Sequence, residues 1–297
     1  MQITIMELWP NFFIVGAMKC GTTSLNEYLK HHPEIFMSEI KEPHYFSKSI
    51  EYDSIFLGEH LIREKEEYLH LFENVKDEKI VGEASTTYLP DPEAPKLIHQ
   101  IVPNARILIS VRDPVERALS HYSPLIQSQH KIGTFHEQIQ DEFKHLKDND
   151  ISKLGLLKCG LYFEGIKRYL DIFEKNHVKI IIFEELVKNT QGILEEILRF
   201  LGVTSAIHNF KPQVHNPYRI SRGPISKSIL WNNTLSNLAR KFLSESTRKS
   251  LSTQILQKKS SKPEMEVKDR NFLIDFYQND VQKLQDLLGK KLPWPIF

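Results

Sequence analysis

Residues 12–24 read FFIVGAMKCGTTS. The first four are apolar without alternation, which predicts a strand buried on both faces of a parallel sheet. Apolar residues at helical spacing lie between Gly21 and Pro33, and they predict a helix that ends before this proline. A buried strand, a glycine loop and a helix in this order turn backbone N–H groups toward a bound anion. The stretch therefore predicts an α/β fold with a phosphate-binding loop.

Three further apolar runs, 80–83, 106–111 and 178–183, predict more buried strands. Helical patterns separate and follow them: a cap at Asp113-Pro114, a capping box at Thr134 and Glu137, and amphipathic runs over 166–173, 193–201 and 273–288. Strands that alternate with helices favour parallel pairing with right-handed crossovers. We therefore expect a single α/β domain, residues 1–297, with a central, mainly parallel sheet and helices on both faces.

The composition is that of an ordinary soluble globular protein, with 297 residues, 40% hydrophobic and 26% charged. It excludes a disordered or collagen-like chain, and no apolar run is long enough to span a bilayer. No secretory signal is expected. Two cysteines, Cys20 and Cys159, cannot form a disulfide framework, and the histidines lack metal-ligand spacing, so no metal is expected. The expected location is the cytoplasm.

The glycine loop is close to a nucleotide-binding P-loop. Gly16 and Gly21 have the spacing of G-x-x-x-x-G-K-[ST], but Thr22 stands at the lysine position, and the lysine lies upstream at Lys19. This arrangement predicts phosphate binding by backbone N–H groups, by Lys19 and by the hydroxyls of residues 22–24. It is poorly suited to a Mg²⁺-bound triphosphate. The simpler alternative is an ordinary turn between a strand and a helix.

A second cation follows the strand predicted over 106–111. Arg112 stands at the carboxyl end of this strand, where open α/β sheets bind their ligands. Arg117 and Ser120 lie on one face of the helix that begins at Pro114. Alone, Arg112 is better explained as a structural salt-bridge partner. Beside the glycine loop, it is placed to bind a second phosphate of the same nucleotide.

Together, two motifs resemble the sulfotransferases that use 3′-phosphoadenosine-5′-phosphosulfate (PAPS). They are residues 17–24 and residues 110–122, which read SVRDPVERALSHY. The likeness is closer to the bacterial and Golgi heparan-sulfate branch because of residues 41–46, KEPHYF, and the pair Leu161-Tyr162. It extends with decreasing specificity to Trp294.

The resemblance implies a nucleotide site and its residues. In that family the glycine loop holds the 5′-phosphosulfate, here Lys19, Cys20, Gly21, Thr22, Thr23 and Ser24. The 3′-phosphate is held by an arginine, a serine and a late basic loop, here Arg112, Ser120, Arg219, Arg222 and Gly223. The product is adenosine 3′,5′-bisphosphate (PAP).

Sulfuryl transfer needs a cation near the leaving phosphate and a base near the acceptor. Lys19 is the candidate cation. Residues 41–44 offer two bases, and we favour Glu42, which stands where the heparan-modifying relatives place a glutamate. His44 is then a supporting or acceptor-binding group, and it remains the alternative base. An unperturbed carboxylate is a weak base, so burial or a nearby negative group would have to raise the pKa of Glu42.

One segment departs from the heparan-type relatives. Residues 80–88 match a stretch that lines their active cleft, but Ala84 stands where they carry a catalytic lysine. This difference weakens the case for a heparan-like acceptor. Glu83 and Ser85 are still expected to face the site, whereas Tyr162 is expected to be a core aromatic residue.

Charge is distributed unevenly along the chain. The net charge is +1, but residues 211–262 hold eleven Lys or Arg against one acidic residue, Glu245, a formal charge of +10. Three interpretations stay open: a solvated helical face, a lid over an anionic cofactor and acceptor, or peripheral docking on an anionic membrane. The segment lacks regular aromatic residues for base stacking, so no nucleic-acid partner is expected.

The sequence thus predicts a PAPS-dependent sulfotransferase that acts on a hydroxyl or amine of a carbohydrate, a glycolipid or a small metabolite. The missing transmembrane segment favours a bacterial, cytoplasmic enzyme. Two alternatives stay open. A P-loop-like nucleotide kinase would bind ATP with Mg²⁺, which the displaced lysine argues against. A catalytically silent module would bind the nucleotide without turnover.

Overall fold

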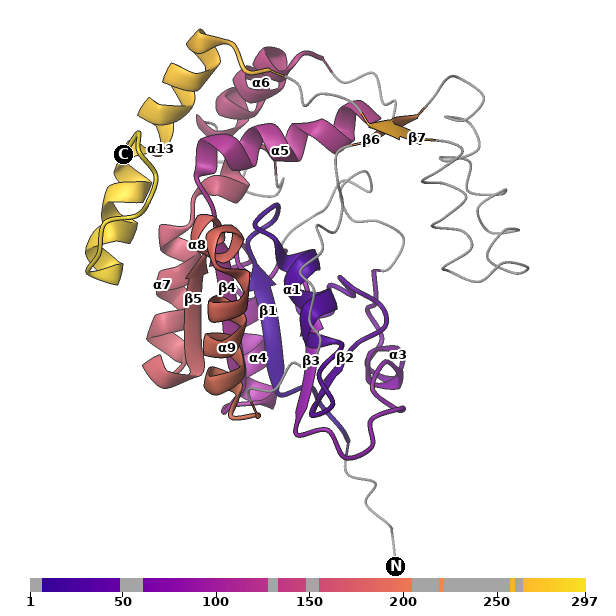
Figure 1. Cartoon of the computed structure of the whole chain (residues 1–297). Coiled ribbons are helices and arrows are strands. Elements are labelled where there is room, and N and C mark those ends of the chain that lie inside the picture. Colours follow the sequence, from indigo (N-terminus) through magenta and orange to yellow (C-terminus); the bar gives the residue numbers. More distant parts are fainter. Residues whose placement is uncertain are drawn as a thin grey trace, which may run out of the picture.

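The computed structural model of the chain is drawn in Figure 1. It describes residues 7–48, 61–127, 133–147, 155–204, 219–221, 257–259 and 264–297. Among these residues, no helix combines the length and the hydrophobicity that crossing a membrane requires.

A five-stranded parallel sheet forms the centre of the fold, in the order β2-β3-β1-β4-β5. Its strands are β1 (Phe12–Gly16), β2 (Ile35–Met37), β3 (Ile80–Ala84), β4 (Arg106–Val111) and β5 (Val178–Ile182). The middle strand β1 pairs with β3 on one side and with β4 on the other. The carboxyl ends of these three strands therefore meet at one edge of the sheet, where open α/β folds bind ligands.

Helices cover both faces of the sheet (Figure 1). Side chains of β1 alternate between two cores, with Phe12 and Ile14 in one and Phe13 and Val15 in the other. The first core is closed by α1 (Thr22–Leu29), α8 (Phe183–Lys188) and α9 (Thr190–Leu201). The second and larger core is closed by α4 (Ala94–Ile101), α5 (Pro114–Gln127), α6 (Phe135–Lys147), α7 (Phe163–Ile172) and α13 (Val267–Leu288). The predicted fold class, a parallel α/β sheet with helices on both faces, is confirmed.

The remaining described elements are short. They are the helix α3 (Lys65–His70), the 3₁₀ turns η1 (Lys158–Gly160) and η2 (Lys175–His177), and the antiparallel pair β6 (Arg219–Ser221) and β7 (Gln257–Lys259).

All four predicted strands are present, and so are the predicted helices that fall within the described residues. The capping box is formed as expected: the N–H of Glu137 donates to the Thr134 hydroxyl at 3.2 Å, and the N–H of Thr134 donates to the Glu137 carboxylate at 2.6 Å. The sequence did not predict β2, α3, α4 or α8. Most of the basic segment 211–262, including Arg222 and Gly223, lies outside the described residues.

Candidate active site

The glycine loop joins β1 to α1 and is tied to the end of β4. The N–H of Ala17 donates to the carbonyl of Ser110 at 2.7 Å, and the Ser110 hydroxyl donates to the carbonyl of Cys20 at 2.6 Å. Lys19 and Gly21 have φ angles of 68° and 82°, in the left-handed region. These turns bring the chain directly into the first turn of α1 at Thr22. The loop therefore ends at a helix N-terminus, which attracts anions.

Arg112 brings the second cation to the same loop. Its guanidinium donates to the carbonyl of Lys19 at 3.5 Å and lies over the ring of Phe183, 4.9 Å from the ring centre. Within the described residues, neither Arg112 nor the Lys19 ammonium has a carboxylate at ion-pair distance. Two cations without an acidic partner, beside a helix N-terminus, make a site for a polyanion.

The other residues of these two motifs differ in exposure. Arg117 is fully buried: its guanidinium donates to the carbonyl of Leu156 and contacts Nδ1 of His121 at 3.3 Å, so it supports the fold. Ser120 is half-buried on α5. The Cys20 thiol is enclosed, and burial raises its pKa to about 12, so this residue offers its backbone rather than a reactive sulfur.

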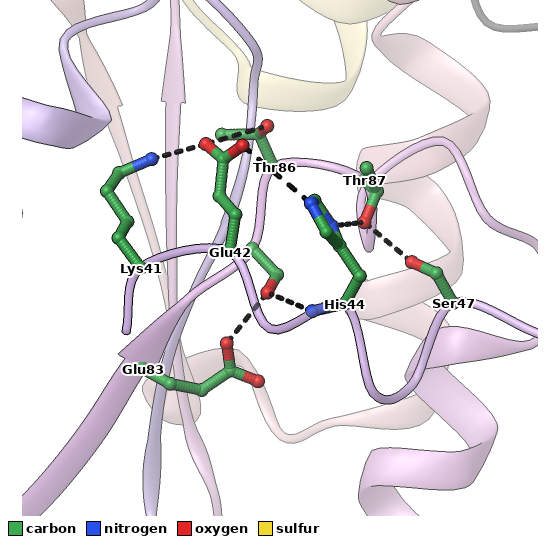
Figure 2. A network of polar contacts seen from close by, with 8 residues as sticks. Lys41, Glu42, His44, Ser47, Glu83, Thr86 and Thr87 are labelled. Carbon is green, nitrogen blue, oxygen red and sulfur yellow. Dashed lines mark hydrogen bonds and ion pairs between the residues drawn. The ribbon is translucent and has the colours of Figure 1, made fainter. Parts of the chain in front are cut away.

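The loop over residues 41–48 lies beside the carboxyl end of β3, because the N–H of Glu42 donates to the carbonyl of Ala84 at 2.9 Å. Figure 2 shows Glu42 between the side chains of Lys41 and His44. The Lys41 ammonium pairs with Oε1 of Glu42, and Nε2 of His44 lies 3.9 Å from Oε2. The Thr86 hydroxyl donates to Oε1 at 3.4 Å.

Charge coupling connects Glu42 to the glycine loop. Burial alone would raise the pKa of Glu42, but the charges of Lys41, His44 and Lys19 outweigh burial and lower it. Burial lowers the pKa of Lys19, and the charge of Glu42 opposes that shift. The two predicted catalytic groups therefore lie in one electrostatic environment. The upward pKa shift that would make Glu42 a stronger base is not present in this state of the protein.

His44 is fully buried and lies next to Glu42. Its Nδ1 is 2.8 Å from the Thr87 hydroxyl, which in turn contacts the Ser47 hydroxyl at 2.6 Å (Figure 2). The backbone N–H of His44 donates to the Ser85 hydroxyl at 3.2 Å. These contacts fix the imidazole against the carboxylate.

Glu83 does not face the site. Its carboxylate is fully buried and accepts hydrogen bonds from the hydroxyls of Tyr68, Ser85 and Tyr88. Tyr162 is a core residue, as predicted, and its hydroxyl donates to the carbonyl of Arg112 at 2.9 Å. Both residues are therefore buried in the core next to the site and do not line it.

A hollow opens beside the glycine loop. It is lined by Ala17, Met18, Thr86, Leu89, Pro90, Lys158, Cys159 and Leu161. Met18 precedes Lys19, and Thr86 donates to Glu42, so the hollow touches both halves of the site.

Two functional residues were missed by the sequence analysis. Phe183 supports Arg112, and a Cβ on Gly21 would lie 2.9 Å from the Phe183 ring. Thr86 contacts Glu42. The parallel pairing of β4 with β5 sets Phe183 beside Arg112, since Val111 and Ile182 are partners in the sheet. Both strands were predicted from the sequence, but their order in the sheet was not.

Some predicted residues remain without a described side chain. Arg219 lies in β6, opposite Lys259, but only its backbone is described. Arg222 and Gly223 lie outside the described residues. In the part of the chain that the structure describes, no group of three His, Cys, Asp or Glu residues is placed to hold a metal ion.

Comparison with known proteins gives consistent results. The family model described as "Sulfotransferase domain" matches residues 10–287. Human carbohydrate sulfotransferase 15 is 29% identical over 248 residues, which cover 65% of this chain and 44% of that protein. Human heparan sulfate glucosamine 3-O-sulfotransferase 6 is 27% identical over 199 residues, which cover 67% of this chain and 54% of that protein. The chain thus spans about half the length of these curated relatives.

Among solved structures, a sulfotransferase from Alicyclobacillus acidocaldarius has the same fold, with a TM-score of 0.73 and 30% sequence identity. The match covers 97% of this chain and 99% of that one.

Proposed function

This chain belongs to the sulfotransferase family, and we propose that it moves a sulfuryl group from PAPS to a hydroxyl or amine of an acceptor, releasing PAP. The observation that supports this most is the meeting of three features at one edge of the sheet. They are the glycine loop with Lys19, the guanidinium of Arg112, which has no carboxylate at ion-pair distance among the described residues, and Glu42.

The residues present fit a nucleotide with two anionic ends. The loop N–H groups, Lys19 and the hydroxyls of residues 22–24 would hold the 5′-phosphosulfate. Arg112, supported on Phe183, and Ser120 would hold the 3′-phosphate. Arg219, Arg222 and Gly223 are proposed to complete this second subsite. When bound, PAPS would supply an activated sulfuryl group.

Lys19 and Glu42 divide the chemistry between them. Lys19 stabilises the charge that grows on the leaving phosphate, and its half-buried position strengthens this interaction. Glu42 takes the proton of the attacking acceptor group. An anionic donor next to Lys19 neutralises one of the cations that lower the pKa of Glu42, so the carboxylate becomes a stronger base when the donor is bound. His44 orients Glu42 from its buried position.

The acceptor is proposed to bind next to Glu42, the candidate base. A carbohydrate, a glycolipid or a small metabolite remains the proposed class. The names of the similar proteins, which include carbohydrate and heparan sulfate sulfotransferases, support the first of these. We place the enzyme in a bacterial cytoplasm, in keeping with its bacterial structural neighbour and two free, buried cysteines.

Calorimetric titration tests the nucleotide site. PAP is compared with ATP plus Mg²⁺, on the wild type and on Arg112→Ala. We expect metal-independent PAP binding that weakens at least about 10-fold in the variant, because a charge-assisted contact to the 3′-phosphate is lost. Binding of ATP–Mg²⁺ without regard to the 3′-phosphate would instead indicate a nucleotide kinase.

Turnover separates an enzyme from a silent module. Transfer from labelled PAPS is followed over a panel of carbohydrate, glycolipid and small-molecule acceptors, with Glu42→Ala as the control. Transfer by the wild type, with PAP affinity kept and transfer lost in Glu42→Ala, supports the proposal. PAP binding without transfer to any acceptor would favour the silent module.

A further inference from the structure

Glu83 is a buried carboxylate that the proposed reaction does not use. It stands in β3, is fully enclosed, and accepts hydrogen bonds from the hydroxyls of Tyr68 at 3.0 Å, Ser85 at 2.8 Å and Tyr88 at 2.6 Å. Buried acids are rare unless they serve a purpose or are fully hydrogen-bonded. Here three hydroxyls point at one group.

Two of these hydroxyls continue to the loop that holds Glu42. The Ser85 hydroxyl accepts from the N–H of His44 at 3.2 Å, and the Tyr88 hydroxyl accepts from the N–H of Phe46 at 3.3 Å. Each hydroxyl has one proton. When that proton is donated to Glu83 in a hydrogen bond, the lone pairs of the hydroxyl oxygen are left to accept from the loop. The carboxylate therefore orients both hydroxyls as acceptors for the N–H groups of His44 and Phe46. Figure 2 shows Glu83 and His44 in this network.

The loop needs such support because its backbone is strained. Glu42 and His44 have φ angles of 61° and 56°, in the left-handed region that side chains other than glycine rarely adopt. Such residues persist only where their surroundings hold them. The N–H of Glu42 is held by Ala84, and those of His44 and Phe46 are held by the hydroxyls bound to Glu83.

We propose that Glu83 is a positioning residue which, through the hydroxyls of Ser85 and Tyr88, holds the loop that carries Glu42 and His44 in its reactive shape. This inference rests on the proposed function, because it takes Glu42 to be the base. Glu83 touches neither donor nor acceptor, and it acts only through the backbone of residues 42–46.

Tyr68 provides a matched control. Its hydroxyl donates to the same carboxylate but to no backbone group of the loop. Its ring stacks on Tyr45, with centres 4.2 Å apart, and packs against Trp9, Phe46 and Phe72, and Tyr68→Phe preserves all of these ring contacts. The test compares Ser85→Ala, Tyr88→Phe and Glu83→Gln with Tyr68→Phe. All four lose a buried hydrogen bond, so all four are expected to melt at lower temperature. Only the first three loosen the loop.

We expect kcat to fall at least about 10-fold in Ser85→Ala, Tyr88→Phe and Glu83→Gln, because a base displaced by a fraction of an ångström loses its alignment. The Kd for PAP should stay within about twofold, since the glycine loop is untouched. Tyr68→Phe should keep kcat within about twofold. An equal loss of kcat in Tyr68→Phe, or none in Ser85→Ala and Tyr88→Phe, would overturn the proposal.

Hydrogen exchange gives a second measurement that needs no turnover. Mass spectrometry of peptides covering residues 41–48 should show faster exchange in Ser85→Ala and Tyr88→Phe, and unchanged exchange in Tyr68→Phe. Unchanged exchange in the first two variants contradicts the positioning role of Glu83, even if the wild type is an active sulfotransferase. A wild type without transfer activity contradicts the proposed function, while the exchange result still tests whether Glu83 holds the loop through Ser85 and Tyr88. If Glu83→Gln does not fold, the two hydroxyl variants suffice.

Discussion

Glu42 is surrounded by the ammonium groups of Lys19 and Lys41 and by the buried imidazole of His44. The charges of the two lysines and the electrostatic interaction with His44 lower its pKa despite burial. Its strength as a base depends on what neutralises those cations. Donor binding at Lys19 is therefore expected to control both the orientation and the basicity of Glu42.

Replacement of this residue tests its role directly. Glu42→Gln should lower kcat by about 10²–10⁴-fold, the usual range for a lost general base. It should keep or improve PAP affinity, because a negative charge near Lys19 is removed. The measurement is single-turnover transfer from labelled PAPS together with calorimetry. Glu39→Gln, an exposed residue nearby, is the control and should be silent. A Glu42→Gln variant with near-normal kcat would transfer the role of base to His44.

The pH profile of the wild type adds to this. The acid limb of kcat/KM reports the free enzyme, and it should lie below the ordinary glutamate pKa because the surrounding cations lower that of Glu42. The acid limb of kcat reports the donor-bound enzyme and should lie higher. If the acid limbs of kcat/KM and kcat have the same midpoint, donor binding leaves the pKa of the base unchanged.

Glu83 shows the opposite shift, because burial raises its pKa to about 7 despite three hydroxyl donors. The folded protein then holds a proton that the unfolded chain releases near pH 4.5. This group's contribution to stability is present below that pH and is lost as the pH rises toward 7. The free energy of unfolding of the wild type, relative to Glu83→Gln, should fall by roughly 3 kcal/mol between pH 4 and pH 8. Urea titrations across this range measure it, and parallel curves would contradict it.

Protonation of Glu83 is compatible with the hydrogen bonds that Ser85 and Tyr88 accept from the loop. When the carboxyl is protonated, one of its three hydroxyl partners must accept instead of donating. Tyr68 can do so, because its hydroxyl supports no backbone group of the loop. Ser85 and Tyr88 then keep their orientation.

At the scale of elements, the turn from β1 into α1 depends on Gly21. Its φ of 82° disfavours any side chain, and a Cβ there would lie 2.9 Å from the Phe183 ring, which supports Arg112. Gly21→Ala should therefore disturb both anion sites and weaken PAP binding at least about 10-fold, besides the roughly 1–2 kcal/mol that a left-handed alanine costs. Calorimetry and thermal melting measure the two effects.

Gly202 offers the control for this substitution. It ends α9 with a φ of 72°, and a Cβ at this position would meet no atom within 4 Å. Gly202→Ala should show the same backbone cost in thermal melting with unchanged PAP affinity. Equal PAP affinities in both variants would indicate that the contact of Gly21 with Phe183 has no bearing on the nucleotide site.

The elements also show what the sequence was able to predict. Long apolar runs such as 106–111 are strands whatever surrounds them, and caps such as Thr134 with Glu137 are local, so both were predictable. The strand β2 has three residues and exists through its pairing with β3, which no local pattern encodes.

The candidate site divides in the same way. Lys19, Arg112 and Glu42 stand in short motifs that the sequence makes visible, and they lie near one another because parallel strands end at a common edge. The surroundings of Glu83 depend on Tyr68, which α3 brings from elsewhere in the chain, so its burial was not predictable. For the same reason the direction of the Glu42 pKa shift was not predictable, because it depends on how close Lys19, Lys41 and His44 lie to the carboxylate in space.

At the scale of the whole molecule, Trp294 contacts residues that support Arg112 at the candidate nucleotide site. The Trp294 indole is buried and donates to Oε2 of Glu184 at 3.0 Å. Oε1 of Glu184 accepts from the N–H of Asp113 at 3.0 Å, next to Arg112. The Trp294 ring also packs near Tyr162, whose hydroxyl donates to the Arg112 carbonyl. Arg112 is therefore held from both sides by distant parts of the chain.

Trp294→Ala should lower the free energy of unfolding by about 3–5 kcal/mol, as for other large aromatic residues removed from a core. Trp294→Phe keeps most of the volume and removes the hydrogen bond to Glu184. It should lose far less stability, with a measurable weakening of PAP binding. Urea unfolding and calorimetry on both variants test this. Unaltered PAP affinity in Trp294→Phe would show that Glu184 holds Asp113 without the indole.

The contact between Trp294 and Glu184 also sets an order of events during synthesis, because the two residues are 110 positions apart. At a translation rate of about 5–20 residues per second, the ribosome needs about 5–20 s to go from one to the other. During that interval the sequences of all five parallel strands have been synthesised, but the indole that packs near Tyr162 has not. Capacity to bind the donor is therefore expected to appear late in synthesis, only after the residues that hold Arg112 from behind have left the ribosome.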